Sequence, residues 1–314
     1  MKIPKIKTKD LLRISDLSKD EILNIFNFSS RLKKEKNCSR NRKYLCGKTL
    51  GMIFEKSSTR TRVSFETGMF QLGGYALFLD SSDIQLGRGE TIEDTAKVLS
   101  KYLDAIMIRT FSHSKVEELA FNSTIPVING LSDSTHPCQA LADFFTIYER
   151  ARDLTQVKLF YIGDGNNVAN SLLLGAAVLG MEISLACPKP CFPDKEIVEK
   201  ARQISLNSGA KITITEDIDV AAKGANFIYT DVWVSMGQEK ELKKKEKMLA
   251  KYKISGEILG KCAPGCLVMH CLPAHRGKEI DSDVMDSDRS VILDQAENRL
   301  HVQKAILCSL IKCK

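Results

Sequence analysis

Short apolar runs alternate with amphipathic stretches along the whole chain, and this alternation limits the possible folds more than any other feature. It is typical of mostly parallel sheets, because helices cover both faces of such sheets. In the first half we expect strands at Thr49–Phe54, Tyr75–Leu79, Asp104–Arg109 and Ile125–Asn129. In the second half we expect strands at Val157–Ile162, Glu182–Cys187, Ala210–Ile214, Ala225–Thr230 and Leu267–Leu272. The pattern predicts an α/β protein.

Two sets of strands in 314 residues predict two domains, each large enough to bury its own core. A helix from about His136 to Arg150 separates the two sets, and its apolar residues recur at helical spacing. Ser18 is the expected N-cap of an earlier helix. We therefore expect domains at residues 1–148 and 149–293, each with a mostly parallel sheet flanked by helices, and a cleft between them.

The net charge of +7 does not by itself indicate a binding partner. Lysines cluster around residues 240–253, where Glu241 and Glu246 interrupt them, as on a solvated helical face. The aromatic or motif context of a nucleic-acid-binding protein is missing. No run of 18 apolar residues predicts a membrane span, and the N-terminal segment lacks the features of a signal peptide. We expect a cytoplasmic protein with no nucleic-acid or membrane partner.

The ten cysteines include two pairs with C-x3-C spacing, Cys187/Cys191 and Cys262/Cys266. Two histidines, His270 and His275, follow the second pair, so zinc binding is one interpretation. Neither pair has the two-residue spacing of structural zinc sites. Reduced structural thiols are the favoured interpretation, and no metal is expected.

The stretch 54–62 places hydroxyl and guanidinium groups where an expected strand ends and a helix begins. Free backbone amides and the positive end of the helix dipole attract anions at such a place. Ser58, Thr59 and Thr61 add hydroxyl groups, and Arg60 has the forked geometry that binds phosphate oxygens. An ordinary N-cap beside solvated arginines would have the same residues, so this stretch alone leaves both interpretations open.

Two further elements favour a ligand site. Arg109 ends the apolar run 105–108, at the carboxyl edge where open α/β sheets bind ligands. His136 and Gln139 stand at another helix start, with Pro137 in the favoured first position. A lone histidine there would more often be a cap. Beside the other elements, His136 is interpreted as a donor to a carbonyl oxygen and Gln139 as a partner for an amide-like group.

Together these motifs resemble the carbamoyl-phosphate signature of the aspartate/ornithine carbamoyltransferase family, from about Leu11 to the C-terminus. The resemblance implies a first domain for carbamoyl phosphate and a second for the amine substrate. It also implies a homotrimer or a multiple of trimers, and a C-terminal helix (residues 294–314) that packs back onto the first domain. The residues that it assigns to carbamoyl phosphate are Ser58, Thr59, Arg60, Thr61, Gln85, Arg109, His136, Gln139, Cys271, Leu272 and Arg299.

The segment Gly163–Asn167 partly resembles a dinucleotide-binding fingerprint. However, Val168 occupies the third glycine position, and the next strand is not followed by an acid that could bind a ribose. A nicotinamide-dependent oxidoreductase is therefore the weaker alternative. The family resemblance instead assigns Asn167 to the carboxylate of ornithine.

The choice of amine depends mainly on Asp231, whose charge suits an α-ammonium group. In the ornithine branch of the family, Ser235 and the amide of Met236 complete the amino-acid site. Cys271 is a second mark of that branch, although a cysteine judged alone is more often a buried thiol. Acetylornithine has no α-ammonium group to satisfy Asp231, and putrescine has no carboxylate to satisfy Asn167. Carbamoyltransferases for these amines are therefore the less favoured alternatives.

The family implies transfer of a carbamoyl group to the δ-amine of L-ornithine, which gives L-citrulline and phosphate. Carbamoyl phosphate is already activated, so no metal, cofactor or covalent enzyme intermediate is expected. Arg109 and His136 are expected to stabilise the oxyanion of a tetrahedral intermediate, while Asp231 and Cys271 orient the amine. Gln85 is expected to reach the site of a neighbouring subunit.

Overall fold

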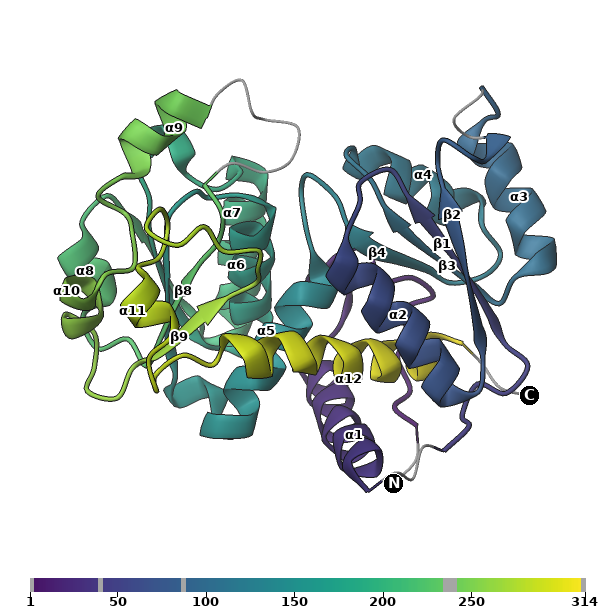
Figure 1. Ribbon diagram of the computed structural model, residues 1–314, viewed down its shortest axis with the longest axis horizontal. Coiled ribbons are helices and arrows are strands. Elements are labelled where there is room, and N and C mark those ends of the chain that lie inside the picture. Colours follow the sequence, from purple (N-terminus) through teal and green to yellow (C-terminus); the bar gives the residue numbers. More distant parts are fainter. Residues whose placement is uncertain (1–2, 39–41, 86–88, 234–241, 312–314) are drawn as a thin grey trace. The chain divides into compact units, whose positions relative to one another are not determined.

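The computed structural model describes residues 3–38, 42–85, 89–233 and 242–311. The chain forms two compact units: unit 1 comprises residues 1–142 and 298–314, and unit 2 comprises residues 143–297. Both boundaries fall inside helices, namely α5 (Pro137–Ala151) and α12 (Ile292–Leu310), whereas the sequence placed them at 148/149 and 293/294 (Figure 1). None of the helices in the described ranges is long and apolar enough to cross a membrane.

Unit 1 has a parallel sheet of four strands in the order β2-β1-β3-β4. The strands are β1 (Thr49–Phe54), β2 (Tyr75–Asp80), β3 (Ala105–Arg109) and β4 (Val127–Leu131). All side chains of β3 are buried, as expected for a central strand covered on both faces. The α/β fold predicted from the apolar runs is confirmed.

The helices of unit 1 cover the sheet. They are the 3-10 turn η1 (Ile14–Asp16), α1 (Lys19–Asn37), α2 (Thr59–Leu72), α3 (Ile92–Tyr102) and α4 (His113–Asn122). α3 and α4 pack together, and Ala96 and Leu119 join Ile106 in one apolar cluster. α2 and α12 lie side by side, because a Cβ added at Gly68 would lie only 3.3 Å from Cγ of Lys304 (Figure 1).

Unit 2 has a parallel sheet of five strands in the order β7-β6-β5-β8-β9. The strands are β5 (Lys158–Ile162), β6 (Glu182–Ala186), β7 (Lys211–Thr215), β8 (Phe227–Thr230) and β9 (Leu267–His270). All five expected strands are present. β9 is two residues shorter than the predicted strand 267–272.

Helices also flank the second sheet. They are α6 (Asn167–Leu179), α7 (Lys195–Ser208), α8 (Ile218–Ala222), α9 (Leu242–Leu249), α10 (Gly256–Gly260) and α11 (Ser282–Met285), with 3-10 turns η3 (Leu154–Gln156) and η4 (Lys189–Cys191). α6 is apolar almost all round and packs against α7, which explains why it is buried from Val168 to Ala177. α8, α10 and α11 contribute to one apolar cluster with β5, β8 and β9.

The order of the strands determines where ligands can bind in each unit. In unit 1 the order reverses between β1 and β3, and in unit 2 between β5 and β8. Segments that leave two such strands diverge at the carboxyl edge and open a crevice there. The loop before α2 and Arg109 therefore share one edge in unit 1. In unit 2, the segment Gly163–Asn167 and Asp231 share the corresponding edge.

Candidate active site

The start of α2 in unit 1 is capped by Ser58. Its Oγ accepts a hydrogen bond from the backbone nitrogen of Thr61 at 3.2 Å. The ordinary N-cap interpretation therefore holds for the Ser58 side chain. It does not exclude an anion, since Thr59 at the first helical position is exposed and the helix start keeps its positive dipole.

Thr61 joins two buried guanidinium groups. Its Oγ1 accepts hydrogen bonds from Nη1 of Arg109 at 3.4 Å and from Nη2 of Arg299 at 3.3 Å. Arg299, on α12, also donates to Oε1 of Gln139. All four side chains are less than 10% exposed (7% for Arg109, 3% for Arg299). Two like charges held around one hydroxyl repel each other, and a bound anion would relieve this repulsion.

His136 lies in the electric field of the same cluster. Burial, and then the positive charges of Arg299, Arg109 and Arg60, hold the pKa of His136 well below its usual 6.5. The imidazole is therefore neutral at physiological pH, with one ring nitrogen that donates a hydrogen bond. This state suits a donor to a carbonyl oxygen. Arg60 lies near enough for its charge to contribute to this lowering.

Lys56 is a further cation near this cluster that was not among the predicted site residues. Its Nζ lies 4.0 Å from the centroid of the Phe111 ring. Burial and the charge of Arg109 lower the pKa of Lys56, while the neighbouring Glu55 binds Lys115 at 2.7 Å. Its position immediately before the hydroxyl-rich start of α2 could have indicated a role in this site from the sequence alone.

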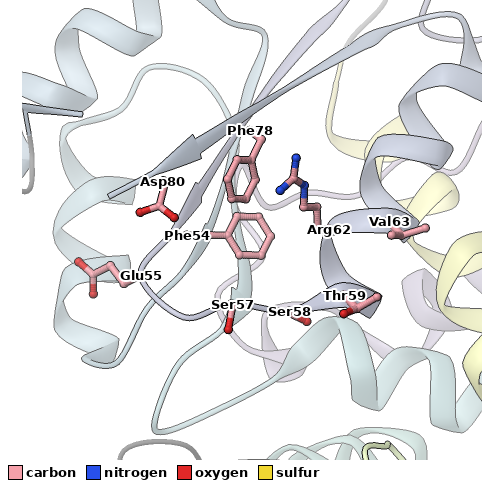
Figure 2. Close-up of a pocket in the computed structure, with 9 residues that line it drawn as sticks. All are labelled: Phe54, Glu55, Ser57, Ser58, Thr59, Arg62, Val63, Phe78 and Asp80. Atoms are coloured by element: carbon pink, nitrogen blue, oxygen red, sulfur yellow. The ribbon is translucent and has the colours of Figure 1, made fainter. Parts of the chain in front are cut away.

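A pocket of about 350 Å³ adjoins the loop before α2. Figure 2 shows Ser57, Ser58 and Thr59 along the loop, with Arg62 beside the aromatic rings of the pocket. The guanidinium carbon of Arg62 lies 3.7 Å from the centroid of the Phe78 ring. The pocket shares only Ser58 and Thr59 with the predicted site residues, so the guanidinium cluster is the better candidate for the reaction.

Asp231 of unit 2 is held through both carboxylate oxygens. Oδ1 accepts hydrogen bonds from Sγ of Cys271 at 2.9 Å and from the backbone nitrogen of Val232 at 2.8 Å. Oδ2 accepts one from Nδ2 of Asn166 at 2.7 Å. Burial and the charge of Asp231 raise the pKa of Cys271 well above 9.0, so Cys271 is a thiol that donates. The result is an oriented carboxylate, suited to an ammonium group.

Asn166 connects Asp231 to the start of α6. As N-cap, its Oδ1 accepts hydrogen bonds from the backbone nitrogens of Val168 at 2.9 Å and Ala169 at 3.2 Å. Because the oxygen faces the helix, the amide nitrogen faces Asp231. Asn167, the predicted ornithine ligand, is the first residue of α6. Asn166 was not among the predicted site residues, although an asparagine directly before an apolar helix is a typical N-cap signal.

The predicted strand 267–272 was too long, because β9 ends at His270. Leu272 has a φ of 59°, in the left-handed region, which strands do not use. Its backbone nitrogen donates to Nδ1 of His270 at 2.8 Å, so Nε2 carries the ring proton and donates to Oε1 of Glu279 at 3.2 Å. The buried Glu279 thus orients the residues around Cys271, and nothing in the local sequence indicated it.

The ligand atoms of Asp231, His270 and Cys271 lie within 4.8 Å of one another, the one such group within the described ranges. Hydrogen bonds account for this arrangement, because both ring nitrogens of His270 and the thiol of Cys271 are engaged. A metal ion would have to break these bonds. His270 and His275 lie against Glu279 and form no metal-ligand group with the second C-x3-C pair.

The remaining predicted residues are Ser235, Met236 and Gln85. Ser235 and Met236 lie outside the described residues. Gln85 is exposed, and its carbonyl accepts a hydrogen bond from the backbone nitrogen of Glu90 at 3.1 Å. Within the described ranges, no hydrogen bond joins Gln85 to the guanidinium cluster of its own chain.

Backbone packing explains the glycines that resemble a dinucleotide fingerprint. Gly163 has a φ of 132°, and a Cβ at Gly165 would lie 2.5 Å from the carbonyl oxygen of Cys191. The intervening Asp164 pairs with Lys245 at 2.8 Å. These contacts account for the glycines without any dinucleotide.

Comparison with known proteins identifies the class. The carbamoyl-P binding domain of aspartate/ornithine carbamoyltransferase matches residues 9–149, and the Asp/Orn binding domain matches residues 155–310. The fold is thus that of a transferase. The chain belongs to the aspartate/ornithine carbamoyltransferase family.

Individual relatives agree along nearly the whole chain. Ornithine carbamoyltransferase of Bacillus thuringiensis subsp. konkukian is 52% identical over 99% of this chain and 97% of its own length. That of Methanosarcina acetivorans is 53% identical over 97% and 99%. The structure titled ornithine carbamoyltransferase from Pyrococcus furiosus has a TM-score of 0.93 and 48% identity, covering 96% of each chain.

Proposed function

We propose that this enzyme transfers the carbamoyl group of carbamoyl phosphate to the δ-amine of L-ornithine, giving L-citrulline and phosphate. The observation that carries the choice of acceptor is the carboxylate of Asp231, held by Cys271 and Asn166 at the edge of the second sheet. The ornithine carbamoyltransferases that match the chain almost end to end support the same acceptor.

Unit 1 is proposed to bind the donor. The start of α2, with Ser58 and Thr59, and the guanidinium group of Arg60 would bind the phosphate oxygens. Arg109 and neutral His136 would donate to the carbonyl oxygen, where negative charge develops as the carbon becomes tetrahedral. The remaining side chains proposed to bind the donor are Thr61, Gln85, Gln139 and Arg299 of unit 1, and Cys271 and Leu272 of unit 2.

Unit 2 is proposed to bind the acceptor. Asp231 would bind the α-ammonium group, and Asn167, Ser235 and Met236 would bind the rest of the amino-acid end. Cys271 keeps its proton, so it acts as a hydrogen-bonding group and not as a nucleophile. The neutral δ-amine attacks the carbonyl carbon directly, and the C–O bond to phosphate breaks as the tetrahedral intermediate collapses. The departing phosphate accepts the amine proton.

An acceptor assay tests this proposal. Phosphate release and product mass would be measured with ornithine, acetylornithine, putrescine and aspartate. We expect ornithine to give kcat/KM at least about a hundredfold higher than each other amine. Acetylornithine has no α-ammonium group for Asp231, putrescine has no carboxylate for Asn167, and aspartate has no δ-amine to attack the carbonyl carbon. A higher kcat/KM for acetylornithine or putrescine would reassign the acceptor. Inertness of all four would instead leave a non-enzymatic anion-binding protein.

Assembly as a homotrimer, or a multiple of trimers, is also proposed. The edge strand β2 exposes Tyr75 (64%) and Leu77 (37%), and the neighbouring α2 exposes Val63 (53%) and Phe70 (74%). A sheet edge with adjoining apolar side chains is a surface that proteins commonly cover with another chain. In a cyclic trimer, each subunit can then contribute Gln85 to the site of one neighbour.

Location in the cytoplasm remains part of this proposal.

A further inference from the structure

Two cysteines flank a tight turn in unit 2, away from the proposed reaction site. Cys262 follows α10, and Cys266 immediately precedes β9. The backbone nitrogen of Cys266 donates to the carbonyl of Ala263 at 3.0 Å, and Gly265 has a φ of 79°. With Pro264 at its second position, this is the arrangement of a type II turn. The reversal places both side chains at one apolar cluster, close enough for each thiol to shift the pKa of the other.

The two thiols differ in access to solvent. Cys266 is 0% exposed and belongs to the apolar cluster beneath β8 and β9. Cys262 is partly buried, packs against that cluster, and places Sγ 3.6 Å from the carbonyl oxygen of Ile258. An oxidant in solution therefore reaches Cys262 first, while Cys266 is buried in the apolar cluster behind it.

The charges around the pair favour the same division of roles. The hydrogen bond from Cys266, and then the positive charge of Lys158, lower the pKa of Cys262. The hydrogen bond with Cys262, followed by burial, raises the pKa of Cys266. Redox-sensitive cysteines combine thiolate character and access with a nearby resolving thiol. Thiolate character, access to solvent and a nearby second thiol occur together at this turn.

We propose that Cys262 and Cys266 form an oxidative modification site, at which a hydroperoxide converts the two thiols into an intramolecular disulfide. The thiolate of Cys262 attacks the peroxide, the O–O bond breaks, and a sulfenic acid forms. The hydroxide that leaves takes up the proton lost by Cys262. Cys266 then attacks the oxidised sulfur, the S–S bond forms, the S–O bond breaks, and the second hydroxide leaves as water with the proton of Cys266. With hydrogen peroxide, two thiols and one peroxide give one disulfide and two waters. An added dithiol reduces the disulfide back to two thiols by thiol–disulfide exchange and is itself oxidised to a disulfide.

The test uses the full-length protein and limiting hydrogen peroxide. After alkylation of remaining thiols, peptide mass mapping gives the oxidation rate of each cysteine. We expect a linked peptide containing Cys262 and Cys266 that disappears after treatment with dithiothreitol. The exposed Cys38 serves as an internal reference, and oxidation at Cys262 should be roughly tenfold faster because its thiolate is favoured.

Two matched variants separate the roles. Cys266→Ser should stop at a sulfenic acid on Cys262, captured by a 1,3-dicarbonyl reagent. Cys262→Ser should leave Cys266 reduced under the same treatment. Circular dichroism and citrulline formation of both reduced variants would verify folding. A wild-type pair that stays reduced while Cys38 oxidises, or a Cys266→Ser protein without the adduct, would overturn the proposal and leave two packed thiols.

Discussion

At the scale of single residues, Asn166 has two tasks because one amide carries both an acceptor and a donor. Its oxygen caps α6, and its nitrogen holds Asp231. We predict that Asn166→Ser, which keeps a cap oxygen, raises KM for ornithine about 10- to 100-fold and leaves KM for carbamoyl phosphate unchanged. The expected loss is that of one charge-assisted hydrogen bond, about 1.5–3 kcal/mol. Steady-state kinetics with each substrate varied would measure it.

A cap that does not touch Asp231 provides the control. Asp194 caps α7 in the same unit, where its Oδ1 accepts from the backbone nitrogen of Glu196 at 2.8 Å. Asp194→Ala should lower thermal stability but leave both KM values near those of the wild type. Equal changes of KM in Asn166→Ser and Asp194→Ala would mean that Asn166 acts only through the helix.

His136 gives a second prediction at this scale, because burial and the nearby arginines lower its pKa well below 6.5 and leave it a neutral donor at physiological pH. Protonation would begin only as the pH falls toward that lowered pKa. The kcat of His136→Gln, which keeps a neutral N–H donor, should therefore remain a constant fraction of the wild-type kcat between about pH 6 and 8. His136→Ala should lose about 10²–10³ in kcat at every pH. A wild-type to glutamine ratio that changes tenfold over this range would show that His136 titrates during catalysis.

At the scale of helices, the contact of α12 with α2 contains a buried lysine that the proposed reaction does not use. Lys304 is 1% exposed, and its Nζ donates to Oε1 of Gln71 at 2.9 Å. Burial lowers the pKa of Lys304 to about 8, which means that the protonated form destabilises the folded state. We predict that Lys304→Met, which keeps an apolar chain of similar length, raises the free energy of unfolding at pH 7 by about 1–3 kcal/mol.

The pH dependence of this gain follows from the direction of the shift. Below about pH 8, both the folded and unfolded wild type carry the proton, so the advantage of Lys304→Met is complete. As the pH rises toward about 10.5, the folded wild type has already lost its proton and the advantage disappears. Denaturant unfolding at pH 7 and pH 10 would compare the two proteins. The exposed Lys200, changed to Met, should show no such trend; a Lys304→Met protein less stable at pH 7 contradicts the prediction.

At the scale of the whole molecule, the proposed trimer predicts that two inactive proteins can restore activity to each other. One parent carries Arg60→Ala, which removes a phosphate contact, and the other carries Gln85→Glu, which places a carboxylate near the phosphate. After refolding in equal amounts, about a quarter of interfaces would pair an intact Arg60 with an intact Gln85. Citrulline formation should return to roughly a quarter of the wild-type rate. Mixed trimers that form, as seen with a charge tag on one parent, yet stay inactive would place each site within one chain.

Much of the architecture could be predicted from the order of residues in the sequence. Nine apolar runs correspond to nine strands within the described ranges. Central strands such as β3 are apolar throughout because both of their faces are buried. Ser18 was readable as a cap, and its side chain accepts from the backbone nitrogen of Glu21. The donor-site motifs were recognisable for a similar reason, since helix starts and strand ends have local signatures.

The tertiary structure decided what depends on residues far apart in the chain. Thr61 and Arg299 are 238 positions apart in the sequence and form a hydrogen bond, and Asp231 and Cys271 do so at a separation of 40 positions. No local sequence pattern could therefore reveal either contact. The end of β9 was missed because His270 binds the backbone of Leu272, which has a positive φ. The neutrality of His136 likewise arises from its burial and from the arginines that folding brings near it. Periodicity in a sequence records which side chains are buried, whereas hydrogen bonds and pKa shifts depend on which buried groups become neighbours.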